Sequence, residues 1–168
     1  MRGRALAVLL LSLAAVSRLS AAAPACSAPE YRQFDFWLGD WDVFDAGAAK
    51  PSMRIRVEKI LDGCALRESY RDDSGKTGES DNIWDASRKV WHQTWVTNRG
   101  QLLVLEGTLE NGVMTLRATE TTPAGPVLWR GVWMPRGGEV RETAETSSDG
   151  GKTTWKPKFD ILFHKHKN

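Results

Sequence analysis

The fold is decided by residues 90–108, which read VWHQTWVTNRGQLLVLEGT. Trp91 and Trp95 stand four positions apart, so on a β-strand both lie on one face, together with Gln93. The turn-forming residues Asn98-Arg99-Gly100 follow, and a second apolar stretch begins directly after them. This pattern is typical of two neighbouring antiparallel strands joined by a short turn.

Segments of this kind recur along the chain, and none of the later sequence keeps a helical period. Between them lie turn residues such as Asp-Gly, Asn-Gly and Gly-Gly, which suit a backbone with positive φ. Because the links are short, we predict an all-β domain, an antiparallel up-and-down β-barrel of about ten strands. The alternative is a two-sheet β-sandwich. The predicted strands are Trp41–Asp45, Met53–Leu61, Cys64–Arg71, Glu79–Asp85, Val90–Thr97, Leu102–Thr108, Val113–Thr119, Val127–Met134, Val140–Thr146 and Thr154–His164.

A short helical turn is predicted before the first strand. Ser27 and Glu30 stand at the spacing of a capping box. Tyr31, Phe34 and Leu38 fall on one helical face, and a glycine ends the pattern. The domain therefore begins with a helical turn and continues in strands.

The first 25 residues have the pattern of a secretory signal peptide. Arg2 and Arg4 precede an apolar run of 12 residues, Ala5–Val16, and small residues follow up to Ala25. The run is too short to cross a bilayer as a helix, so we expect no transmembrane anchor. We predict a signal peptide at 1–25, a single domain at 26–168, and export to the periplasm or the medium. A lipoprotein anchored at Cys26 is the less favoured alternative.

Charge and cysteine content bear on partners and compartment. Residues 1–25 hold three of the 23 basic residues and none of the 21 acids, so their removal changes the formal net charge from +2 to −1. A near-neutral domain has no electrostatic reason to bind nucleic acid, and we expect a monomer. The two cysteines, Cys26 and Cys64, both lie in the exported part, where a disulfide is expected.

Candidate ligand-binding residues follow from the strand faces that carry tryptophan. If those faces point inward, they bring several polar side chains with them, and each buried polar group left unpaired costs roughly 1–3 kcal/mol. So many polar groups favour a wet or ligand-filled cavity over a solid core. The predicted ligand-binding residues are Glu68, Tyr70, Asn82, Trp91, Gln93, Trp95, Trp133, Arg141 and Glu145.

Three motifs carry a resemblance to known proteins. They are FDFWLGDWDV (34–43), DGCALRE (62–68) and WHQTWV (91–96). They resemble a domain-of-unknown-function family of exported bacterial proteins with an FDFWxGxW opening motif, related to calycin and lipocalin barrels. The likeness implies structural roles for Gly39 and Trp41, with Trp41 closing the barrel base under Arg141 or Arg130.

The function predicted from these observations is the binding of a small, largely apolar or aromatic molecule inside an exported barrel. The alternatives are a filled barrel with a structural or partner-binding role and a hydrolase that uses Glu68 and Glu145. No catalytic motif is present, and we assign no catalytic residue and no metal site. His92 falls on the face opposite Gln93, so we expect it at the surface. No cofactor is predicted. Haem, with His164 as axial ligand, is the weaker alternative.

Overall fold

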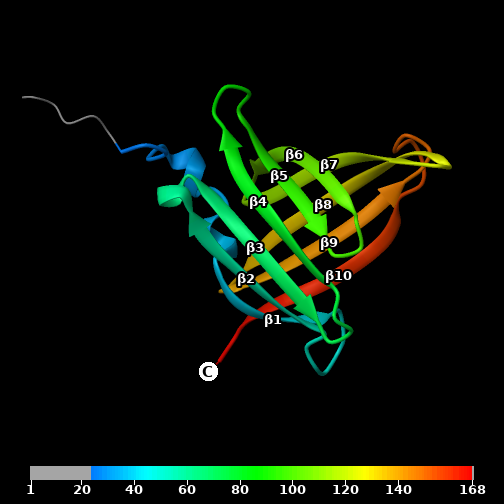
Figure 1. Cartoon of the computed structure of the whole chain (residues 1–168), viewed down its shortest axis with the longest axis horizontal. Coiled ribbons are helices and arrows are strands. Elements are labelled where there is room, and N and C mark those ends of the chain that lie inside the picture. Colours follow the sequence, from blue (N-terminus) through cyan, green and yellow to red (C-terminus); the bar gives the residue numbers. More distant parts are fainter. Residues whose placement is uncertain (1–23, 168) are drawn as a thin grey trace, which may run out of the picture.

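The computed structural model describes residues 24–167. Ten antiparallel strands form a closed barrel in which each strand pairs with the next and β1 also pairs with β10 (Figure 1). This confirms the predicted barrel and excludes the sandwich. The predicted signal peptide lies almost wholly outside the described residues. The strands are β1 (Gly39–Asp45), β2 (Met53–Ile60), β3 (Ala65–Asp72), β4 (Thr77–Asp85), β5 (Val90–Thr97), β6 (Leu102–Glu110), β7 (Val113–Thr122), β8 (Gly125–Arg136), β9 (Glu139–Ser147) and β10 (Lys156–Lys165).

The hairpin turns follow the local sequence. Between β6 and β7, Asn111 and Gly112 both have positive φ, 52° and 78°, and Glu110 pairs with Val113 across the turn. A two-residue turn with this backbone matches the right-handed twist of the strands, and Asn-Gly is its preferred sequence. Links of this length leave no room for a crossover, so the strands follow one another around the ring.

One end of the barrel is closed by the N-terminal segment. Its short 3-10 turns, η1 (Pro29–Arg32) and η2 (Asp35–Trp37), pack there beside η3 (Leu61–Gly63), as Figure 1 shows. Phe34 and Trp37 are fully buried, with ring centroids 5.0 Å apart. Phe34 also meets Trp91 and Trp133 edge-on, at 5.6 and 5.5 Å. We call Phe34 and Trp37 the aromatic plug.

The helical turn was predicted correctly, but its cap was not. The turn is 3-10 rather than α-helical, and the residue before it is Ala28, with no side-chain hydrogen bond. The capping box predicted for Ser27 and Glu30 is therefore wrong. The burial of the aromatic plug, rather than a polar cap, holds this segment in place.

A disulfide joins Cys26 to Cys64, as predicted, and ties the N-terminal segment to the start of β3. Arg32 reinforces the joint because its guanidinium donates hydrogen bonds to the carbonyl oxygens of Cys26 and Gly63. The bond occupies the Cys26 sulfur, which a lipid anchor at this residue would need. The lipoprotein alternative does not fit this arrangement.

Candidate functional site

A cavity of about 280 Å³ lies inside the barrel and reaches the end opposite the aromatic plug. Its wall is mostly aromatic and aliphatic, and Trp133 separates it from Phe34 of the plug. The mouth lies among the loop ends, where Lys76 pairs with Asp72 at 3.7 Å and Arg99 donates to the hydroxyl of Tyr70 at 3.2 Å. The apolar side chains of the wall are Met53, Ile55, Tyr70, Trp95, Leu103, Leu105, Trp129, Trp133, Ala144, Phe159 and Ile161.

A hydrogen-bonded polar cluster lies on the inner faces of β3, β4 and β5. The Ser80 hydroxyl donates to Glu68 Oε2 at 2.7 Å and accepts from Asn82 Nδ2 at 3.0 Å and Gln93 Nε2 at 3.2 Å. The register explains the cluster, because Glu68 is opposite Ser80 and Asn82 is opposite Gln93. We call Glu68, Ser80, Asn82 and Gln93 the inner polar cluster.

A second carboxyl group, Glu142 on β9, lines the same cavity. β9 lies four strands from β3 around the ring, so Glu142 and Glu68 reach the cavity from different sides. Glu142 makes no hydrogen bond to any of the described residues that lie around it. The buried indole N–H of Trp133, the cross-strand neighbour of Glu142, is also unpaired among the described residues. The cavity thus holds two acids, and one of them has no fixed partner.

Burial changes the acidity of both groups. Removal from water raises the pKa of Glu68 to about 7, although the hydrogen bond from Ser80 acts in the opposite direction. Burial also raises the pKa of Glu142 well above its ordinary value, and the nearby charge of Glu68 adds to the rise. The Trp133 indole opposes this rise, although it closes no hydrogen bond of normal geometry. Both groups therefore retain protons more strongly than exposed carboxyls do.

The structure brings five of the nine predicted ligand-binding residues to the cavity wall: Glu68, Tyr70, Gln93, Trp95 and Trp133. Two others are fully buried in the packed part of the barrel. Trp91 donates from its indole to Gln33 Oε1 at 3.0 Å, and Asn82 lies beneath the wall, where its amide bonds Ser80 and the Leu66 carbonyl. These two support the site without lining it.

The inward orientation predicted for Arg141 and Glu145 is wrong. On β9 the buried positions are Val140, Glu142 and Ala144, so the alternate residues point outward. Arg141 pairs with Asp160, and Glu145 accepts from Arg130 Nε at 2.7 Å, both on the outer face. The apolar side chains determine which face is buried, and they bring Glu142 inside instead. A hydrolase that uses Glu68 and Glu145 is therefore excluded by position.

Trp41 lies at the closed end, as the lipocalin likeness implies, but its cover is a lysine. The indole donates to the Trp37 carbonyl at 2.9 Å, and Lys165 Nζ lies 3.6 Å from the ring centroid. Neither Arg141 nor Arg130 reaches it, because both are held in outer-face ion pairs. Gly39 has a φ of 143°, a backbone conformation that residues with a Cβ rarely adopt, so the position favours glycine.

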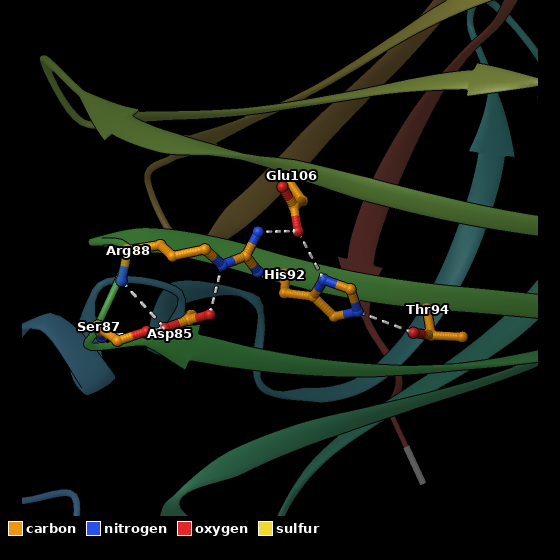
Figure 2. A network of polar contacts seen from close by, with 6 residues as sticks. All are labelled: Asp85, Ser87, Arg88, His92, Thr94 and Glu106. Carbon is orange, nitrogen blue, oxygen red and sulfur yellow. Dashed lines mark hydrogen bonds and ion pairs between the residues drawn. The ribbon is translucent and has the colours of Figure 1, made fainter.

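His92 lies on the outer face, as predicted (Figure 2). Its Nδ1 is 3.1 Å from Glu106 Oε1, and its Nε2 is 3.0 Å from the Thr94 hydroxyl. Arg88 bridges Glu106 and Asp85, at 2.8 and 2.6 Å (Figure 2). The hydrogen bond from His92, followed by the one from Arg88, lowers the pKa of Glu106. The network ties β4, β5 and β6 together on the outside and does not reach the cavity.

His164 also lies on the outside of the barrel. It pairs with Glu139 at 2.8 Å and meets the Phe44 ring edge-on, whereas its neighbour Phe163 points inward. It cannot act as an axial ligand to a group inside the cavity.

The wall also contains residues that were not among the predicted ligand-binding residues, and two of them, Trp129 and Glu142, bear on the proposed chemistry. Trp129 shares a face with Trp133, and this spacing was itself a signal. Glu142 was signalled by Val140 and Ala144, the apolar neighbours that mark its face as the buried one. Both residues could have been found by choosing the face of each strand from its aliphatic side chains.

No family model matches this chain, and the search of curated proteins finds no relative. The resemblance carried by the FDFWxGxW motif therefore stays a proposal. Among residues 24–167, no helix has the length and apolar character needed to cross a membrane.

Proposed function

We propose that this protein is an exported barrel that binds a small, largely apolar molecule in its aromatic-lined cavity. The observation that carries the proposal is the combination of a hollow half of the barrel with a polar cluster set into its apolar wall. Pockets for small molecules have this composition, because apolar surface supplies affinity and a few fixed polar groups orient what is bound.

The size of the cavity limits what it can hold. A dry protein cavity of about 150 Å³ accommodates benzene. By proportion, about 280 Å³ suits a molecule of roughly eleven non-hydrogen atoms. A long lipid or a porphyrin exceeds this volume unless part of it extends through the mouth.

Export is supported by the disulfide and by the predicted signal peptide. Disulfides persist in oxidising compartments such as the periplasm or the medium. The likeness to calycin-type barrels agrees with a binding role, and it is part of the proposal.

Tryptophan fluorescence tests binding directly, since Trp95, Trp129 and Trp133 line the cavity. We expect saturable quenching or a spectral shift on titration with small aromatic and aliphatic compounds. A flat response to the whole panel would contradict the proposal and favour a filled, structural barrel.

Variants locate the binding in the cavity. Trp95→Ala removes a wall residue and Gln93→Ala removes a polar group, so each should weaken binding by roughly tenfold or more. Trp155→Ala is the matched control, because Trp155 packs on Arg130 outside the barrel, 4.2 Å from its guanidinium. If both cavity variants bind as tightly as this control, the site is elsewhere.

A further inference from the structure

The free polar atoms of the cavity wall are mainly carboxyl and amide oxygens. Glu68 Oε1, both carboxyl oxygens of Glu142 and the Gln93 amide oxygen have no donor among residues 24–167. The donors that oppose them are the unpaired indole N–H of Trp133, the second amide hydrogen of Gln93 and the proton that a carboxyl carries while it is neutral. A molecule that fits this wall must bring N–H or O–H groups of its own.

The charges of the wall are also one-sided. The acids Glu68 and Glu142 lie in the interior, only 6% and 8% exposed. The basic residues among the lining side chains, Lys76 and Arg99, are at the mouth, where each already has a partner. Two carboxyls that share a buried cavity without a basic side chain lack the pairing that buried charges require.

Aromatic rings flank the same space. Tyr70 and Trp95 stack with centroids 6.3 Å apart near the mouth, and Trp133 lies next to Glu142. The faces of such rings attract cations, most strongly where water is excluded. The two carboxyl groups and the aromatic rings therefore both favour a positively charged group.

We infer that the small molecule held in this cavity is an organic cation, an amine with an apolar body whose ammonium group is paired by Glu68 and Glu142. This inference rests on the proposed function and specifies the chemistry of its ligand. The ammonium would donate to the free carboxyl oxygens, and the apolar body would lie against the tryptophan wall. A neutral or anionic molecule of the same shape brings no positive charge to pair with either carboxylate.

The test uses three probes that differ in their polar end: 4-phenylbutylamine, 4-phenyl-1-butanol and 4-phenylbutyrate. The amine and the alcohol each have eleven non-hydrogen atoms, the size indicated by the cavity volume. Calorimetric titration of the full mature protein should show the amine binding about tenfold to a hundredfold tighter than the alcohol, with the carboxylate weakest.

Proton release separates charge pairing from simple apolar binding. Because burial favours the protonated form of both acids, and the pKa of Glu68 is about 7, pairing with a cation should displace protons to the buffer. The amine should release protons in calorimetry run in two buffers of different ionisation enthalpy, and its affinity should rise from about pH 6 to about pH 8. The alcohol should do neither. The other ionisable groups that line the cavity are Tyr70, Asp45, Asp72, Lys76 and Arg99.

Variants complete the test. Glu68→Gln and Glu142→Gln should each lower the affinity for 4-phenylbutylamine by about tenfold or more and change that for 4-phenyl-1-butanol by less than about threefold. Glu145→Gln, on the outer face, should change neither. If the alcohol or the carboxylate binds as tightly as the amine, the cation inference is wrong while the proposed function stands. If none of the three binds, both fail.

Discussion

Glu68 carries an ionisable group into the barrel interior, and this affects stability. Its pKa is about 7 in the folded protein, against an ordinary value of 4.5. Below about pH 4.5 the group is protonated in both the folded and the unfolded state, so its burial carries no penalty that depends on pH. Between about pH 4.5 and about pH 7, the folded state holds a proton that the unfolded chain has released. The free energy of unfolding therefore falls by roughly 3 kcal/mol over this range.

We predict that Glu68→Gln reduces this loss. The wild-type protein should lose thermal stability between about pH 4.5 and about pH 7, and Glu142 contributes in the same direction. The variant should lose distinctly less over the same range. Thermal unfolding followed by circular dichroism measures the difference, with Glu145→Gln expected to follow the wild type. Parallel curves for wild type and Glu68→Gln would show that Glu68 is not buried as described.

Individual residues also show which side-chain orientations could be predicted from the sequence and which could not. The pairing of Glu68 with Ser80 could be anticipated, because the tryptophans of β4 and β5 mark their inner faces. The orientation of β9 could not be read from aromatic residues, since this strand has none. Its two faces carry Val140, Glu142 and Ala144 on one side and Arg141 and Glu145 on the other. Val140 and Ala144 mark the buried face, and the partners Arg130 on β8 and Asp160 on β10 hold Glu145 and Arg141 on the outer face.

Among the elements, the N-terminal segment determines which end of the barrel is closed. The segment is held in place by the burial of Phe34 and Trp37 and by the disulfide between Cys26 and Cys64. The link closes a loop with a sequence separation of 38 residues. In the chain-entropy model, a loop of this length stabilises the folded state by about 4 kcal/mol.

The double variant Cys26→Ala/Cys64→Ala should therefore unfold at a clearly lower denaturant concentration than the wild type. We expect the free energy of unfolding to fall by about 3–4 kcal/mol, with the slope against denaturant somewhat steeper because the unlinked unfolded chain exposes more surface. Denaturation followed by tryptophan fluorescence measures both. Equal midpoints for the oxidised wild type and the variant would contradict the role given to this bond.

The strands were the most predictable elements, because alternation and turn residues are local signals. Each predicted strand matches an observed strand, and the predicted and observed ends differ by no more than three residues. The capping-box prediction failed because the burial of the aromatic plug outweighs a local polar cap. This burial depends on contacts with residues distant in the sequence, such as Trp91 and Trp133. The cover of Trp41 was missed for the same reason, since Lys165 lies at the other end of the chain.

The whole molecule is divided into a solid half and a hollow half. At the aromatic plug, Trp91 meets Phe34 and Phe163 meets Trp37 edge to face, whereas the opposite half encloses the cavity. The number of aromatic residues in the sequence does not predict this division into a solid and a hollow half. The division depends on which aromatic rings contact the N-terminal segment. Of the predicted ligand-binding residues, Glu68, Tyr70, Gln93, Trp95 and Trp133 line the hollow half, whereas Asn82 and Trp91 are buried outside the cavity wall.

The most direct test of ligand binding in the hollow half is a ¹H–¹⁵N spectrum of the tryptophan indole groups. It would be recorded while the protein is titrated with 4-phenylbutylamine and, separately, with 4-phenyl-1-butanol. We expect saturable shifts of the indole signals of Trp95, Trp129 and Trp133, which line the cavity, while the signals of Trp155 on the outside and Trp41 at the closed end stay in place. Shifts confined to Trp155, or no shift with either compound, would contradict ligand binding in the hollow half.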